Sequence, residues 1–201
     1  LVLMLALPCA LALAVFGQPM VATLFHRGAF DANAVAMTTL AVMGYGAGVI
    51  GLVGVKVAAP AYYAQQDMQT PMRVAIGALV LTQVFNAGLI LGLGMGVAAL
   101  ALSIGLAANA NAGALIWGLK RRGSYVPSAG WAGFALRVVV ASAVMGVGMW
   151  LAARHVDWLE LGRHELLRAG AMAAALAGAA AVYFGMLALL GIQLRSFMPK
   201  A

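Results

Sequence analysis

Between Arg73 and Lys120 the chain reads VAIGALVLTQVFNAGLILGLGMGVAALALSIGLAANANAGALIWGL (residues 74–119), a run of 46 residues without a charged side chain. As a single helix this run would extend roughly 69 Å at 1.5 Å per residue, about twice the hydrocarbon thickness of a bilayer. Two membrane spans must therefore share it. We expect the break at residues 92–96, GLGMG, because three closely spaced glycines remove helix preference and permit a tight turn.

The remainder of the chain repeats this pattern of long apolar runs separated by short charged segments. Hydrophobic residues make up 65% of the 201 residues and charged residues only 8%, unlike a soluble globular domain. The run at residues 32–63 exceeds the roughly 20 residues that a span needs, so its helix should be tilted, broken or extended into the interface. We predict an all-α polytopic membrane helix bundle with six transmembrane helices in one lobe, at residues 1–25, 32–63, 74–93, 97–119, 131–153 and 166–194.

The distribution of Lys and Arg predicts which ends of the spans face the cytoplasm. When the six crossings alternate, one side receives seven basic residues and one acidic residue, and the other receives four of each. Positive residues are retained on the cytoplasmic face, so the first side and the C-terminus are predicted to be cytoplasmic. Tryptophans near the span ends fit interfacial aromatic belts on both sides: Trp117, Trp131, Trp150 and Trp158.

Several classes of function are excluded by composition and motif. Twelve Lys and Arg spread among so many apolar residues cannot form the dense basic face of a nucleic-acid-binding protein, despite the net charge of +7. His164-Glu165 is not followed by the second His of a zinc-protease helix, and no Ser lies in a Gly-x-Ser-x-Gly context. With Cys9 as the single cysteine, multi-cysteine zinc sites are excluded as well. We predict no enzyme, no metal and no cofactor.

Lys56 is the only charged residue in the second predicted span. An ionisable group within a span is costly and tends to mark a cavity or a substrate path. At 100° per residue, Thr38, Tyr45 and Tyr63 lie within about 20° of Lys56 around a helix, so one face would carry a stripe of hydroxyls and an ammonium group. We interpret this stripe as the lining of a cavity. The alternative is that Lys56, about two turns from the cytoplasmic end, snorkels to the headgroups.

Uncharged polar residues in the third and fourth spans cannot remain unsatisfied in lipid, and must face protein or water. Interhelical hydrogen bonds are the simpler interpretation for Gln83, Asn86, Ser103, Asn109 and Asn111. Cavity lining is the alternative, and Gln83, Asn86 and Asn111 are further candidates for the site. Two arginines near the start of a span are expected to be interfacial anchors: Arg137 and Arg168.

Small residues recur at spacings that let helix backbones approach closely in lipid. They are Gly44, Gly48, Gly51 and Gly54 in the second span, Gly88 and Gly92 in the third, and most of Ala169–Ala181 in the last. Tight helix packing is the expected result, and a lipid-accepting groove beside the last helix is the alternative.

Two spans also carry recognisable start signals. Asp31 can cap the second helix, and Thr70, followed by Pro71 at the first helical position, can cap the third.

Two segments carry sequence motifs of a known family. Residues 19–31, PMVATLFHRGAFD, resemble the pattern L-F-x-R-G-x-F-D, and residues 55–73, VKVAAPAYYAQQDMQTPMR, resemble K-V-x-x-P-x-[FY]-Y-A-x-x-D-x-x-T-P-x-[RK]. The loop at 120–127 fits K-R-R-G-x-Y-x-P. These patterns are those of the MurJ/MviN lipid II flippases, and the chain resembles that family over essentially its whole length.

The resemblance implies the C-terminal part of a MATE-like, two-lobe transporter in the bacterial cytoplasmic (inner) membrane. Its substrate would be lipid II, an undecaprenyl pyrophosphate bearing a sugar-peptide headgroup, moved by alternating access through a cationic cavity. Lys56 matches the family's cationic cavity residue, and the final two helices would form a groove for the lipid tail. Further partners would be membrane lipids and the N-terminal lobe of the same protein.

Two other functions remain open at this stage. The first is another transporter of the same superfamily, such as a polysaccharide-lipid flippase or a drug and cation antiporter. The second is a non-transporting membrane scaffold, in which Lys56 would face lipid headgroups and no polar cavity would exist.

Overall fold

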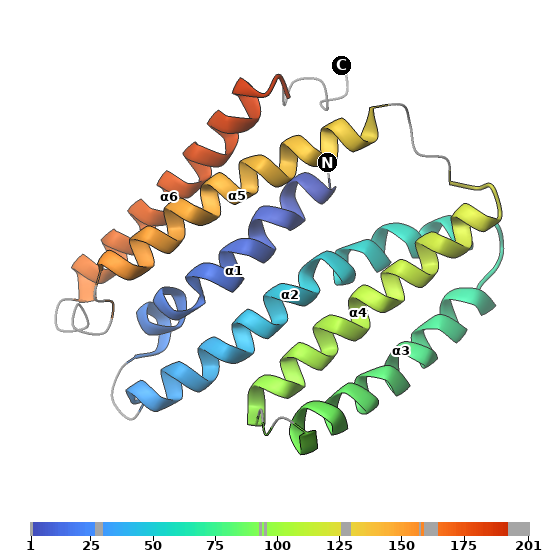
Figure 1. Cartoon of the computed structure of the whole chain (residues 1–201), viewed down its shortest axis with the longest axis horizontal. Helices are drawn as coiled ribbons and strands as arrows, with labels where there is room; N and C mark the ends of the chain where they lie inside the picture. Colours follow the sequence, from blue (N-terminus) through green and yellow to red (C-terminus); the bar gives the residue numbers. More distant parts are fainter. Residues whose placement is uncertain are drawn as a thin grey trace. The chain divides into compact units, whose positions relative to one another are not determined.

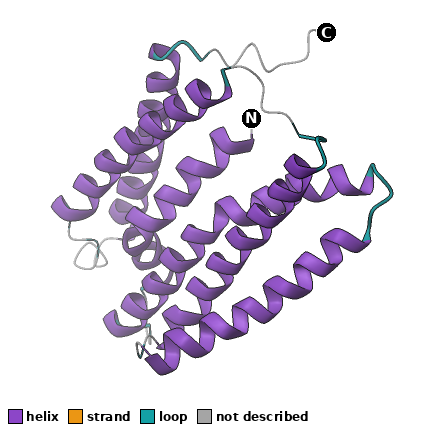
Figure 2. Cartoon of the chain, turned by 45° about the vertical axis from the view of Figure 1, so that its right-hand side comes forward, coloured by secondary structure: helices purple, strands orange, loops and turns teal. Residues whose placement is uncertain are grey.

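The computed structural model describes residues 2–26, 30–92, 94, 96–125, 130–156, 158 and 165–192. Within these residues the chain is helical and contains no strand (Figures 1 and 2). The helices are α1 (Val2–Phe25), α2 (Ala32–Tyr63), α3 (Gln69–Ala87) with its π-helical end η1 (Gly88–Gly92), α4 (Gly96–Arg121), α5 (Trp131–His155) and α6 (Glu165–Leu189). Six segments are long and apolar enough to cross a membrane, which confirms the predicted all-α, six-span bundle.

The sixth helix ends at Leu189 rather than at residue 194, and the third helix differs from its predicted bounds chiefly at its start. It begins at Gln69 rather than at residue 74, and it ends in η1 just before the expected glycine break. Gly94 and Gly96 have φ angles of 63° and 26°, in the left-handed region that glycine adopts without steric cost. Glycine is therefore needed at the turn between η1 and α4. Leu93 and Met95 lie outside the described residues.

The chain divides into two compact units, and the boundary falls within α2. Unit 1 contains residues 1–39 and 130–201, and unit 2 contains residues 40–129. In unit 1, α1 packs against both α5 and α6, and α5 packs against α6. The ring of Phe16 meets Trp158 edge to face, with centroids 5.4 Å apart. Trp158 is only 4% exposed, because the aromatic contact with α1 covers it, and its place in an interfacial belt stays a prediction.

Unit 2 is built on a close approach of α2 to α4. A Cβ atom added to Gly44, Gly48 or Gly51 would overlap backbone atoms of α4, chiefly at Leu102, Gly105 and Asn109. This confirms the prediction of tight packing for the glycines of the second span. The same prediction is wrong for Gly88 and Gly92, because no heavy atom of the described structure comes within 4 Å of their added Cβ positions.

The start of α2 follows the prediction from its sequence. The carboxylate of Asp31 accepts a hydrogen bond of 2.8 Å from the backbone N–H of Ala34, and the Asp31 carbonyl accepts one from Val35 N–H. Asp31 therefore satisfies a backbone donor in the first turn that has no partner within the helix.

Candidate substrate-binding site

Three members of the predicted polar stripe lie on one face of α2 in unit 2. Tyr45 and Tyr63 are 49% and 51% exposed, and Lys56 is also exposed. Lys56 has no ion-pair or hydrogen-bond partner among the residues that the structure describes. Thr38, the fourth member, is half-buried and belongs to the part of α2 in unit 1. The stripe is thus a free polar face of a membrane-spanning helix, with one uncompensated positive charge.

The packing of α2 on α4 keeps Lys56 out of the helix interface. At 100° per residue, Lys56 lies roughly 80–140° around the helix from Gly44, Gly48 and Gly51, which face α4. Because these glycines meet backbone atoms, α2 cannot rotate to bring Lys56 against α4 without a clash. The fixed rotation of α2 therefore exposes the ammonium group.

Tyr62 fixes the same rotation near the end of α2. It is fully buried, and its hydroxyl donates a hydrogen bond of 2.8 Å to the carbonyl of Leu115 in α4. Ala58, Leu115 and Leu119 surround it in a small apolar cluster. In the pair Tyr62-Tyr63, one phenol thus anchors the helix and the other stays on the exposed stripe.

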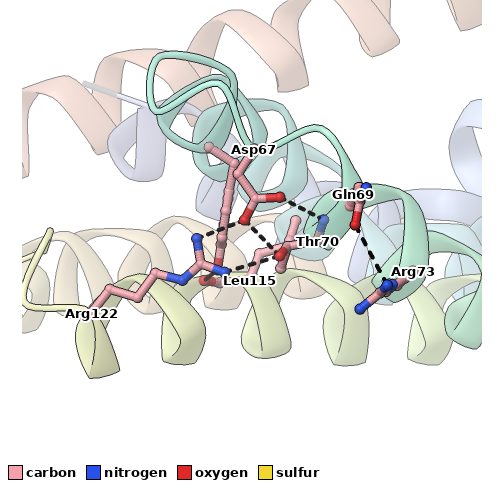
Figure 3. A network of polar contacts seen from close by, with 7 residues as sticks. Asp67, Gln69, Thr70, Arg73, Leu115 and Arg122 are labelled. Carbon is pink, nitrogen blue, oxygen red and sulfur yellow. Dashed lines mark hydrogen bonds and ion pairs between the residues drawn. The ribbon is translucent and has the colours of Figure 1, made fainter.

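A polar network joins the turn between α2 and α3 to the end of α4 (Figure 3). The carboxylate of Asp67 accepts hydrogen bonds from the backbone N–H and the hydroxyl of Thr70, at 2.9 and 2.7 Å. Arg122 donates from Nη1 to Asp67, at 2.7 Å, and from Nη2 to the Thr70 hydroxyl oxygen, at 2.9 Å. The Arg122 guanidinium also lies over the ring of Tyr62, 5.1 Å from its centroid. Asp67, Thr70 and Arg122 are called the turn network below.

The turn network corrects the predicted start of α3. The residue before the helix is Met68, which makes no side-chain cap, and Thr70 lies within the first turn. Asp67 performs the capping instead, because its carboxylate reaches the Thr70 N–H three residues on. These hydrogen bonds from Thr70, followed by the one from Arg122, hold the pKa of the Asp67 carboxyl well below its usual range.

The polar residues of α3 and α4 have separate environments. The Ser103 hydroxyl is buried and contacts both the Asn86 side-chain oxygen and the Ala99 carbonyl. The Asn109 amide donates to the Ala47 carbonyl of α2, at 2.8 Å. Interhelical hydrogen bonding is therefore confirmed for Asn86, Ser103 and Asn109. Gln83 is exposed, and the side-chain oxygen of Asn111 is buried without a partner in the described structure.

The two arginines expected at the interface differ. Arg137 is exposed on α5, whereas Arg168 is only 1% exposed near the start of α6. Nη2 of Arg168 lies 3.5 Å from the carbonyl of His26, just after the end of α1. Arg168 is thus buried beside the end of α1, whose last carbonyls attract a cation, and its role as an interfacial anchor stays a prediction.

No metal-binding group can be assembled from the described part of the chain. Across those residues, no set of three or more His, Cys, Asp and Glu side chains converges.

A family model for lipid II flippase MurJ matches residues 1–167. The chain belongs to this family. It is 41% identical over 98% of its length to the lipid II flippase MurJ of Burkholderia cenocepacia. Probable lipid II flippases MurJ of Vibrio cholerae and Haemophilus influenzae are 33% and 30% identical, over 97% and 100% of the chain. These relatives are flippases, which are transporters, in agreement with the prediction that the chain is not an enzyme.

The chain spans 38% of the length of the Burkholderia MurJ and 37% of the Vibrio protein. Both motif segments, 19–31 and 55–73, lie within the part matched by the MurJ family model. The second motif contains Lys56 together with Asp67 and Thr70 of the turn network. Arg122 was not identified as their partner from sequence, because it lies 55 residues from Asp67 and nothing local connects the two.

Proposed function

We propose that this chain is the C-terminal part of a flippase that carries lipid II across the bacterial cytoplasmic membrane by alternating access. Membership of the MurJ family and six membrane-spanning helices support this function. The C-terminus lies in the cytoplasm, because its side of the bundle carries seven basic residues and one acidic residue, whereas the other side carries four of each. The remaining lobe of the same protein completes the transport path.

In this proposal the exposed stripe of α2 binds the substrate headgroup. A diphosphate cannot cross hydrocarbon unaided, so the path must supply cations in a solvated cavity. Lys56 supplies an ammonium group without a competing anion among the described residues. Along the helix, Tyr63 lies roughly 10 Å and Tyr45 roughly 16 Å from Lys56 at 1.5 Å per residue. Their hydroxyls donate to the sugar and peptide groups, and the exposed Gln83 lines the same path.

The turn network has a mechanical role in the proposed cycle. Alternating access moves rigid groups of helices against one another around a binding site. Asp67, Thr70 and Arg122 tie the junction of α2 and α3 to α4, and Tyr62 ties α2 to the same helix. Lys56 therefore moves with α2, α3 and α4 as one body.

The observation that carries the proposal is the exposed, unpaired Lys56 within a 32-residue membrane helix. In the full-length protein reconstituted into vesicles, Lys56→Ala should lower the rate of lipid II translocation by at least about tenfold, since it removes a charge contact to an anion. Lys56→Arg should retain most of the activity.

Arg137→Ala is the matched control, because it removes an exposed cation from another span. Its translocation rate should stay near that of the wild type. Wild-type rates for Lys56→Ala and Arg137→Ala alike would contradict the role of the stripe and would favour a headgroup position for Lys56.

A further inference from the structure

Unit 1 contains an apolar pocket between α1 and α5 that the proposed transport path does not use. Its volume is about 470 Å³, within the range of ligand pockets. Leu7, Leu11 and Val15 of α1 form one wall, and the other wall runs along α5 from Val139 to Trp150. Apart from Ser142, every lining residue is apolar or aromatic, so the pocket fits hydrocarbon rather than a polar ligand.

The pocket runs along the middle part of α5 over a length close to the thickness of one leaflet. Val139 and Trp150 are eleven residues apart on α5, or roughly 16 Å at 1.5 Å per residue. Half of a hydrocarbon core is about 15 Å. An α-helix with its side chains is roughly 10 Å in diameter. One extended alkyl chain is much narrower than a helix.

A cation lies at one end of the pocket. The guanidinium of Arg154 lies over the ring of Trp150, 4.0 Å from its centroid, one helical turn beyond the last lining residue. Arg154 is exposed and has no carboxylate partner in the described part of the chain. Among the described residues no side chain occupies its N–H donors, and guanidinium binds phosphate well.

We infer that this pocket binds an anionic membrane phospholipid from the leaflet at the His155 end of α5. One acyl chain lies between α1 and α5, and the headgroup phosphate binds Arg154. In the proposed orientation this is the non-cytoplasmic leaflet. The site is distinct from the stripe on α2 in its residues and in the ligand that it takes.

A larger side chain at Gly146 would block the pocket. A Cβ atom added there would overlap the side chain of Leu11, whereas Gly148 has open space at the same position. Gly146→Leu should therefore fill the pocket, and Gly148→Leu adds the same side chain to the same helix without touching it. Ala143→Phe and Val144→Phe form a second pair, in which both positions are exposed and only Ala143 lines the pocket.

The test is native mass spectrometry of the full-length protein with phosphatidylglycerol, phosphatidylethanolamine and undecaprenyl diphosphate in competition. Gly146→Leu and Ala143→Phe should each lower phosphatidylglycerol binding about tenfold, and Gly148→Leu and Val144→Phe should leave it unchanged. Arg154→Gln should reduce the preference for phosphatidylglycerol over phosphatidylethanolamine about fivefold, as expected for one interfacial cation. Arg137→Gln is the control for charge alone.

Three results would overturn the inference. Phosphatidylglycerol bound equally by all the variants would show that the pocket is not its site. The pocket would instead bind the substrate tail if undecaprenyl diphosphate displaced phosphatidylglycerol from the wild type and if Gly146→Leu no longer bound undecaprenyl diphosphate. A wild-type protein that retains no phospholipid would show that another part of the full-length protein fills the pocket.

Discussion

The carboxylate of Asp67 connects the turn between α2 and α3 with the end of α4. It caps the first turn of α3 and at the same time pairs with Arg122. Both interactions require the ionised form, because a protonated carboxyl loses its charge and half of its acceptor capacity. Ionisation of this one side chain therefore strengthens the tie between the start of α3 and the end of α4, beside the hydrogen bond from Arg122 to Thr70.

The depressed pKa of Asp67 predicts a specific dependence on pH. A carboxyl whose folded-state pKa is lowered contributes stability above its unfolded pKa, near 3.8, and loses it only as the pH falls through the lower folded value. Asp67 should thus remain ionised from pH 8 down to pH 4. Carbon NMR of labelled aspartate carboxyls would test this. A midpoint near pH 4 for Asp67 would contradict the turn network.

Arg122 and its neighbour Arg121 allow the network to be separated from general charge effects. Arg121 lies over Trp117, 3.9 Å from the ring centroid, and has no part in the turn network. Arg122→Gln should lower the melting temperature in detergent by a few degrees, because Asp67 and Thr70 lose their partner. Arg121→Gln should lower it less. The opposite order would show that the turn network adds nothing to stability.

At the scale of the helices, α2 is held in place by its end as well as by its glycines. The Asp67 N–H donates to the Tyr62 carbonyl and the Gln66 N–H to the Tyr63 carbonyl, the hydrogen-bond pattern of a Schellman motif. Its left-handed residue is Gln66, with a φ of 57°. The corresponding positions after α4 and α6 are Gly123 and Gly191, which adopt such angles without steric cost.

This difference predicts a stabilising substitution. Gln66→Gly should raise the free energy of unfolding by up to about 1 kcal/mol, because a non-glycine residue pays roughly that amount in the left-handed region. Gln65→Gly, one position earlier, should be neutral or destabilising. Thermal unfolding in detergent measures both variants, and a loss of stability in Gln66→Gly would contradict the assigned helix end.

The contact of α2 with α4 gives a second prediction at this scale. Gly51→Ala should destabilise the protein by roughly 1–3 kcal/mol, because the added methyl group overlaps α4 backbone near Asn109. Gly77→Ala is the control, since nothing in the described structure lies within 4 Å of that position on α3. Unfolding in a denaturing detergent would compare the two. Equal stabilities would remove the packing argument for the rotation of α2.

The sequence predicts those features that depend on local periodicity and fails where distant segments meet. The six spans follow from hydropathy, and the glycines of α2 follow from their helical spacing. Asp67 and Thr70 are both good capping residues three positions apart, so the cap could not be assigned to one of them from sequence. Burial of Arg168 depends on where α1 ends, and pairing of Arg122 depends on where α2 turns.

At the scale of the whole molecule, the orientation of the bundle is open to a direct test. In the proposed topology the loop after α4 is cytoplasmic and the loop after α5 is not. A reporter that fluoresces only in the cytoplasm should be fluorescent when it is fused after Ser124 of the protein, with its N-terminal part retained. Fusions after Val156 should give active alkaline phosphatase, an enzyme that needs export. The reverse pattern would invert the topology.

In the proposed function, Lys56 faces a water-filled path that lipid II enters. Val57 is its neighbour, exposed to 54%, and points about 100° away around α2. In a full-length Cys9→Ser background, the most direct measurement is the reaction of Lys56→Cys and Val57→Cys with a membrane-impermeant thiol reagent. We expect the cysteine at 56 to react quickly and to be protected when lipid II accumulates, whereas the cysteine at 57 should stay unreactive in lipid. A cysteine at 56 that fails to react, or that reacts equally with and without lipid II, would contradict the proposal.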